Sequence, residues 1–212
     1  MFYQYPMGKN TIQDVEDKAN IRELIEFERY CRDYMHWEEM RGCYHDDAVI
    51  TVSWMKGGPD EFTEKSRVRP APAKHKIFNT LVWKNGARAI AECIVMIQIR
   101  CPLDGDIVDL STHTRLHYRV EKRQGVWKIC SMDAVYEKDT MRSAFTDGTF
   151  SADREELEKY RPTYANMMLR QVHYGGSPNG ELAGEDRPES IEALYKESSA
   201  WLEAGVGREE DR

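Results

Sequence analysis

The stretch that decides the fold is residues 74–101, KHKIFNTLVWKNGARAIAECIVMIQIRC. Two runs rich in β-branched and aromatic residues flank Asn85-Gly86, a pair typical of the two-residue turn that joins antiparallel strands. We therefore expect strands over 74–83 and 87–101. The second run is long enough to need a bulge or a bend.

The chain on either side extends this pattern. Turn residues at 123–125 separate two further predicted strands, over 109–122 and 126–134. Upstream, apolar residues recur at helical spacing over 11–41, and AVITVSW at 48–54 is typical of a strand. The order predicts an α+β fold in which a curved antiparallel sheet wraps on N-terminal helices.

The C-terminal part differs in composition and predicts helices. Residues 151–172 carry an amphipathic helical pattern interrupted or begun at Pro162, and a last helix is expected over 189–202. We therefore divide the chain into an α+β barrel domain, residues 1–140, and a helical C-terminal extension, residues 141–212. We expect the extension to pack on the barrel or on a neighbouring subunit.

Composition excludes several function classes. The formal net charge is −7, which argues against a nucleic-acid-binding protein because phosphate contacts need a basic surface. No apolar run reaches the ~18 residues of a membrane span, and Met1–Gly8 lacks the features of a signal peptide. The five cysteines form no C-x-x-C pair, so we predict reduced thiols in a cytoplasmic protein.

One helical stripe and one histidine are candidates for catalysis. Glu26, Tyr30, Asp33 and Trp37 follow one another at spacings of four, three and four, which places them on one side of the predicted helix. If His75 faced Asp33, the carboxylate would fix the imidazole tautomer and raise its basicity. A solvated aspartate and a hydrogen-bonded strand histidine remain the simpler alternatives.

The strand over residues 111–121 separates an apolar face from a charged one. The apolar set, Thr114, Leu116, Tyr118 and Val120, is expected to face the core or a pocket. The charged set, His113, Arg115, His117 and Arg119, is expected to face solvent or a neighbouring subunit. The two histidines lie too far apart on a strand, ~13 Å, to share a metal ion, and we predict no metal site.

Several segments together resemble the SnoaL-like proteins of the nuclear transport factor two-like superfamily. They are residues 21–54, 75–79, 85–89 and 121–129, and the resemblance covers roughly residues 12–138. It implies a cone-shaped barrel with a deep pocket. The dehydratases and the dehydrochlorinase of this family use an aspartate on the first helix and a histidine at the start of a central strand.

Asp33 and His75 match these two positions, so the resemblance implies that they form a catalytic pair. Tyr30 is the expected proton donor to the leaving group. The expected substrate-binding residues are Trp54, Asn79, Thr114 and Tyr118.

These features predict a cofactor-independent lyase, dehydratase-like, or an isomerase that acts on a hydrophobic cyclic molecule such as a steroid or polyketide. A non-catalytic binding or assembly protein is the alternative from another class. A hydrolase or cyclase is a third, favoured if Glu26 or Glu92 points inward beside Asp33. We expect a homo-oligomer, a dimer or trimer, because the charged sheet face would then be partly covered.

Overall fold

The computed structural model describes residues 10–69 and 73–205. The elements in chain order are α1 (Ile12–Asp33), α2 (Trp37–Gly42), β1 (Tyr44–Val52), β2 (Met55–Gly57), α3 (Pro59–Arg67), β3 (Lys74–Asn85), β4 (Arg88–Leu103), β5 (Asp106–Arg123), β6 (Val126–Ser143), α4 (Arg154–Leu157), α5 (Ala165–His173), β7 (Ala183–Gly184) and α6 (Pro188–Glu203). Within the described residues, no helix combines the length and apolarity needed to cross a membrane.

The strands form one curved sheet in the order β2-β1-β6-β5-β4-β3, with β7 beside β6. The meander from β3 to β6 is antiparallel, as predicted. The predicted hairpin is confirmed, but its two turn residues are Gly86 and Ala87, because Asn85 is the last residue of β3 and pairs with Arg88. Gly86 has a φ of 58°, which favours glycine. β1 lies parallel to β6, and the path of pairings leaves the sheet open between β2 and β3.

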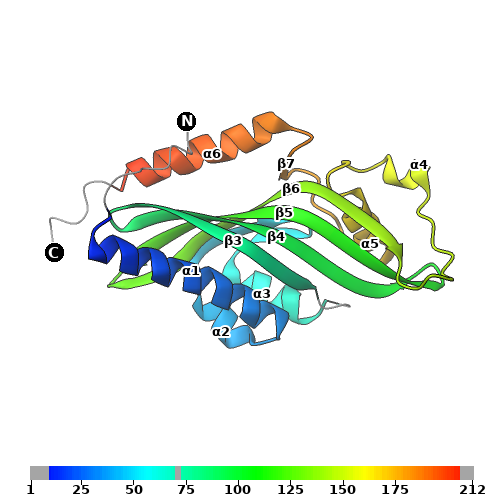
Figure 1. The fold of residues 1–212 in the computed structure, drawn as a ribbon, viewed down its shortest axis with the longest axis horizontal. Helices are drawn as coiled ribbons and strands as arrows, with labels where there is room; N and C mark the ends of the chain where they lie inside the picture. The colour runs from blue at the N-terminus through cyan, green and yellow to red at the C-terminus, as the bar shows by residue number, and fades with distance from the viewer. Residues whose placement is uncertain (1–9, 70–72, 206–212) are drawn as a thin grey trace.

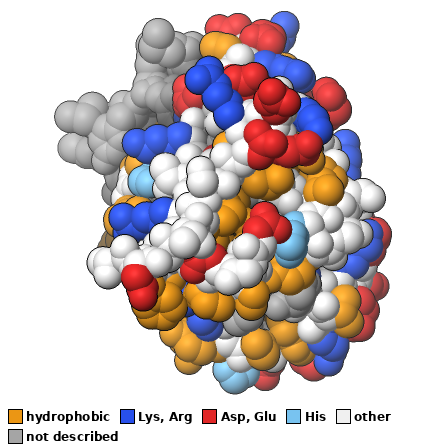
Figure 2. All heavy atoms as spheres, turned by 90° about the vertical axis from the view of Figure 1, so that its right-hand side faces the viewer, with side chains coloured by type: hydrophobic (Ala, Val, Ile, Leu, Met, Phe, Trp, Pro, Cys, Tyr) orange, Lys and Arg blue, Asp and Glu red, His pale blue; other side chains and the backbone are white. Residues whose placement is uncertain are grey.

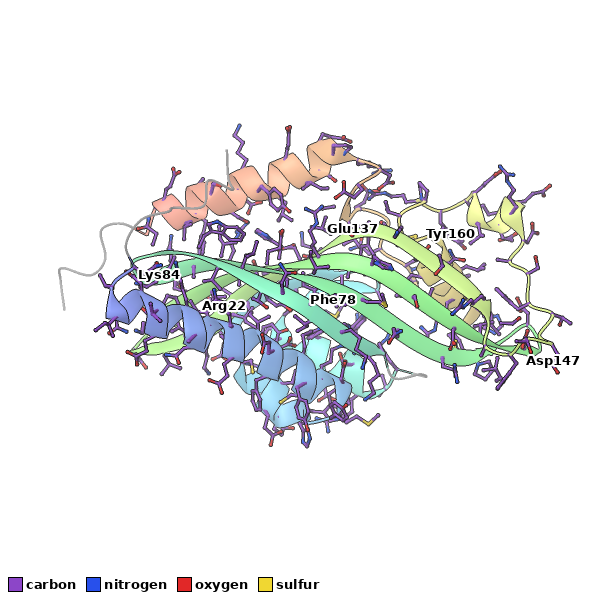
Figure 3. All side chains as sticks on the ribbon, viewed as in Figure 1. Arg22, Phe78, Lys84, Glu137, Asp147 and Tyr160 are labelled. Atoms are coloured by element: carbon purple, nitrogen blue, oxygen red, sulfur yellow. The ribbon has the colours of Figure 1, made fainter. Side chains whose placement is uncertain are left out.

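The N-terminal helices pack on one side of the sheet (Figure 1). Ile21 and Ile25 of α1 are fully buried against this side. Arg22 fixes the seam between α1 and β3, since its Nε donates to the carbonyl of Thr80 at 3.2 Å. Figure 3 shows Arg22 at this seam, with Phe78 further along the same strand.

A buried carboxylate anchors the N-terminal half of α1. Asp17 accepts hydrogen bonds from Trp127 Nε1 and Lys122 Nζ, both at 2.9 Å, and Lys84 Nζ lies 3.2 Å away. Burial acts to raise the pKa of Asp17, but these three donors outweigh it and lower the pKa to about 2. The helix is thereby fixed to three strands of the sheet.

The predicted helix over 11–41 is wrong in one respect, because it consists of two helices. α1 ends at Asp33, and Met35 adopts a φ of 65°, which lies in the left-handed region and cannot continue a helix. Trp37 therefore begins α2 and does not share a stripe with Asp33.

The expectation that the charged face of β5 meets solvent or another subunit is also wrong. α6 crosses the opposite side of the sheet from α1 (Figure 1), and His117 beneath it is fully buried. Arg115 donates to Tyr195 Oη at 2.8 Å, and Arg119 donates to Ser198 Oγ at 3.1 Å. The chain covers this face itself, so the face no longer argues for an oligomer.

The C-terminal part begins on the curved sheet itself, and the division of the chain at residue 140 stays a prediction. β6 runs through that position to Ser143, and the predicted helix over 151–172 is two short helices, α4 and α5.

Figure 2 views this end of the molecule, where hydrophobic side chains gather in the middle and lower part of the face and charged ones crowd the upper part.

Candidate active site

A hollow lies between the concave side of the sheet and the helices α1, α3 and α5. With its open mouth it holds about 510 Å³ of space not occupied by atoms. Its walls are mostly apolar and aromatic; they include Trp54, Phe62, Ile97, Ile99, Leu116, Ala134, Tyr136 and Met167. The charged and titratable side chains at its border are Arg29, Arg32, Arg69 and His75. An apolar hollow with a few convergent polar groups is typical of a small-molecule site.

Asp33 and His75 meet at the wall of this hollow. Asp33 is the last residue of α1, and His75 is the second residue of β3. The Nδ1 atom of His75 lies 2.6 Å from Oδ1 of Asp33, and the backbone N–H of His75 donates to Oδ2 at 2.5 Å. Both side chains are almost completely buried. The two carboxylate oxygens therefore hold the histidine by its ring and by its main chain.

This geometry assigns the tautomer of the imidazole. An ionised carboxylate only accepts hydrogen bonds, so Nδ1 of His75 carries the proton and Nε2 keeps its lone pair. Asp33 borders the outer groove of α1 and β3, while His75 borders both that groove and the hollow. The ring thus stands between its carboxylate partner and the hollow.

Burial and the neighbouring charges together decide the protonation states of Asp33 and His75. Burial acts to raise the pKa of Asp33, but the ring and backbone N–H of His75 and the charge of Arg32 lower it below the ordinary value. Burial, helped by the charges of Arg32 and Arg29, lowers the pKa of His75 to about 4 and outweighs the opposing effect of Asp33. Asp33 acts to raise the pKa of His75, as expected, but the net pKa is still lowered, because burial outweighs Asp33 and the two arginines add to the effect of burial. At neutral pH the pair is a carboxylate and a neutral imidazole.

Two predicted site residues, Tyr30 and Asn79, lie at the outer groove instead of the hollow. Tyr30 is 54% exposed, and its ring lies 4.6 Å from that of Tyr34 between the centroids. Asn79 is exposed on β3. Both border the outer groove together with Asp33 and His75. The helical turn at residues 29–33 directs Arg29 and Arg32 inward and Tyr30 outward, so Tyr30 borders the outer groove and its donor role stays a prediction.

Of the remaining predicted wall residues, one borders the hollow and two are buried elsewhere in the sheet. Trp54 borders the hollow as expected. Thr114 is buried in the sheet, where its hydroxyl donates to the carbonyl of Val135 at 2.7 Å. Tyr118 is fully buried, and its hydroxyl has no hydrogen-bond partner among the described residues. Neither Thr114 nor Tyr118 borders the hollow; Leu116, between them, does. The reason is that period two fixes a face of the strand but not the position of the hollow along it.

The arginines of the hollow were missed by reasoning from the sequence. Arg29 is buried and donates from Nε and one terminal nitrogen to the two carboxylate oxygens of Glu28, which also accepts from the hydroxyl of Tyr44 at 2.7 Å. Arg32 lies 3.7 Å from Oδ1 of Asp33. The sequence shows that Arg29 and Arg32 are three residues apart and so share a face of the helix, but whether this face turns inward depends on the tertiary packing.

A second histidine–carboxylate pair lies on the other side of the sheet. Nδ1 of His117 is 3.0 Å from Oε2 of Glu92, and its Nε2 is 2.9 Å from Oγ of Ser198 on α6. Glu92 is therefore beneath α6, and Glu26 is exposed at the outer groove. The carboxylates that would have favoured a hydrolase or cyclase do not border the hollow.

We also searched the described residues for side chains that could bind a metal ion. Across residues 10–69 and 73–205, no three side chains of His, Cys, Asp or Glu gather closely enough to hold an ion.

Comparison with curated proteins finds distant relatives of similar length. A PEP2-like protein of Fusarium vanettenii is 26% identical over 202 residues, a match that covers 89% of this chain and 87% of the relative. An uncharacterized protein of Emericella nidulans is 24% identical over 207 residues, with coverages of 89% and 87%.

Comparison with solved structures concerns the fold. A type 2 hexachlorocyclohexane dehydrochlorinase has a TM-score of 0.55 at 14% identity, over 66% of this chain and 96% of that one. A Novosphingobium aromaticivorans protein named as a candidate scytalone dehydratase has a TM-score of 0.51 at 15% identity, with the same coverages. The profile of the SnoaL-like domain matches residues 13–133, which is more than half of the sequence. The chain therefore belongs to the SnoaL-like domain family, as its sequence pattern predicts.

Proposed function

We propose that this protein is a cofactor-independent lyase, dehydratase-like, or an isomerase, in which His75 takes a proton from a carbon atom of a hydrophobic cyclic substrate. The observation that carries the proposal is the imidazole of His75, held by Asp33 at 2.6 Å at the wall of an apolar hollow. The neighbouring folds include proteins named for dehydration and dehydrochlorination, and both of these reactions are eliminations.

The chemistry follows from the state of the pair. Asp33 fixes the ring and its tautomer, so the lone pair of Nε2 is the group available to accept a proton from the bound molecule. The pKa of His75, lowered to about 4, keeps that lone pair free at neutral pH. When the proton moves to Nε2, the adjacent Asp33 carboxylate stabilises the resulting imidazolium. Positioned general bases of this kind contribute ~10²–10⁴-fold in rate.

A generic carbon acid tests the proposal before the natural substrate is known. In 5-nitrobenzisoxazole, removal of the ring C–H proton breaks the N–O bond, and the product is a coloured cyanophenolate. We expect the protein to accelerate this ring opening. We expect His75→Gln to lower the rate ~10²-fold and Asp33→Asn to lower it by a smaller factor, since the latter keeps the base but not its orientation.

Tyr30→Phe is the matched control, because Tyr30 lies outside the hollow. We expect it to retain the wild-type rate, whereas a donor role for Tyr30 would lower it. Equal rates for the wild type and His75→Gln, with both proteins folded, would contradict general-base catalysis and favour a non-catalytic binding protein.

A further inference from the structure

The charges that border the hollow are unbalanced. Of its three arginines, Arg29 is paired with the buried carboxylate of Glu28, and Arg32 lies 3.7 Å from the carboxylate of Asp33. Asp33 also accepts two hydrogen bonds from His75, but a neutral imidazole leaves the negative charge of Asp33 unchanged. Two carboxylates therefore stand against three guanidinium groups, and one positive charge at the hollow is left without a described counter-charge.

The unbalanced charge is that of Arg69. No described carboxylate lies within ion-pair distance of Arg69, and its guanidinium carbon stands 4.4 Å from the ring centroid of Trp54, another wall residue. Arg32 and Arg69 both border the main hollow and also the small one beside it, so they stand where the two meet. Their charges face the same space from α1 and from the segment that follows α3.

A fourth arginine lies behind them. Arg170 of α5 is 1% exposed, and its Nε and one terminal nitrogen have no hydrogen-bond partner among the described residues. Burial and the charges of Arg32 and Arg170 lower the pKa of Arg69 to about 10, and burial together with Arg29 lowers the pKa of Arg32 to about 10. Both arginines remain charged at neutral pH. Buried charges without partners are costly, so a bound anion would stabilise this arrangement.

The excess is local. The whole chain carries a net charge of −7, so the accumulation of arginines at the hollow runs against its average composition. Each guanidinium presents N–H groups in a planar fork that matches a carboxylate, and arginine is less strongly hydrated than lysine. Trp54 and the aliphatic residues of the sheet offer the adjoining surface to an apolar ring.

We propose that the molecule bound in this hollow is an organic acid, an apolar ring system that carries a carboxylate, and that Arg32 and Arg69 bind the carboxylate. This deepens the proposed function by naming its substrate class and rests on it only for the claim that the bound acid is a substrate. The carboxylate end lies toward the two arginines, and the ring lies between Trp54 and the sheet, beside His75.

Two probes of matched shape test the proposal, 2-naphthoate and its neutral counterpart 2-naphthamide. We expect calorimetric titration at constant ionic strength to show at least ~10-fold tighter binding of the naphthoate, which corresponds to ~1.4 kcal/mol. In Arg32→Gln and in Arg69→Gln the preference should fall below ~3-fold. Arg69 is only partly buried, so Arg69→Gln remains informative if the more buried Arg32 proves necessary for folding.

Arg100→Gln is the charge-matched control, since Arg100 is exposed on β4 and paired with Asp109. It should keep the preference of the wild type. A preference below ~3-fold in the wild type, or no binding of the naphthoate at millimolar concentration, would overturn the proposal. So would an unchanged preference in a folded Arg69→Gln variant.

A further variant separates this proposal from the proposed function. His75 is neutral at neutral pH, so His75→Gln should keep the naphthoate preference even though it loses proton abstraction. If the protein prefers naphthoate but His75→Gln does not change ring opening, the carboxylate site stands and general-base catalysis by His75 is refuted. If ring opening depends on His75 but naphthoate is not preferred, general-base catalysis stands and the carboxylate site is refuted.

Discussion

The protonation of His75 should be visible in the stability of the protein. Its pKa is lowered from the ordinary 6.5 to about 4, by burial and by two arginines. Between these two pH values the unfolded chain binds a proton at residue 75 and the folded chain does not. The contribution of His75 to the free energy of unfolding is therefore fully present above pH 6.5 and is lost as the pH falls toward 4.

The magnitude follows from the same two values. At 1.36 kcal/mol for each pKa unit, the His75 contribution to the free energy of unfolding falls by about 3 kcal/mol between pH 7 and pH 4. Other groups add their own pH dependence, so the informative quantity is the difference between the wild type and His75→Gln. The glutamine does not titrate, and we expect the variant to lose about 3 kcal/mol less than the wild type over this interval.

Urea denaturation at several pH values, followed by circular dichroism, measures this difference. His36→Gln, at an exposed histidine that precedes α2, is the control and should keep the extra loss because His75 is still present. Nitrogen chemical shifts of the His75 ring should also report a neutral imidazole, protonated at Nδ1, at pH 5.5. Parallel pH profiles for the wild type and His75→Gln, or a charged ring at pH 5.5, would refute the electrostatic account of the site.

Three further predictions concern the scaffold. Asp17→Asn should lower the free energy of unfolding by about 1 to 2 kcal/mol at pH 7, measured with urea; because the pKa of Asp17 is about 2 when folded, this cost should be complete above pH ~4 and fade as the pH falls toward 2. Tyr118→Phe should leave stability unchanged or raise it by up to ~1 kcal/mol in thermal unfolding, since it removes a buried hydroxyl that has no described partner, and a loss of ~2 kcal/mol would reveal an unrecognised hydrogen bond. Tyr195→Phe removes a 2.8 Å hydrogen bond to Glu92 and should reduce amide hydrogen-exchange protection in α6 but not in α1; unchanged protection of α6 would show that this bond does not fix the helix.

Local patterns in the sequence predict the sheet well. The turn after Asn85 requires a positive φ at Gly86, and the flanking residues alternate, so nearby residues alone fix the β3–β4 hairpin. The parallel pairing of β1 with β6 joins segments about 80 residues apart, and no local pattern encodes such a contact. The break at Met35 was missed because apolar spacing continues across it.

The candidate site was predicted only in part, because it too depends on contacts between segments that are far apart in the sequence. Asp33 and His75 were proposed from a family resemblance, and the structure brings them within hydrogen-bond distance. Tyr30 was expected in the pocket but borders the outer groove, because spacing along a helix gives only the relative directions of side chains, and the burial of Arg29 and Arg32 sets which face turns inward. His117 was expected at the surface because its contact with Ser198 of α6, 81 residues later in the chain, could not be foreseen. Whether the protein forms a homo-oligomer and works in the cytoplasm stays a prediction.

The covering of the outer sheet face by α6 has a consequence for comparisons based on catalytic templates. Ser198, His117 and Glu92 follow one another at 2.9 and 3.0 Å, the spacing of a hydrolytic triad, yet the serine and the histidine have no exposed surface. A template search that scores side-chain geometry alone would rank this sealed trio beside the pair of His75 and Asp33. Solvent contact at the nucleophile, rather than interatomic spacing, is the criterion that tells a working constellation from a structural one in this chain.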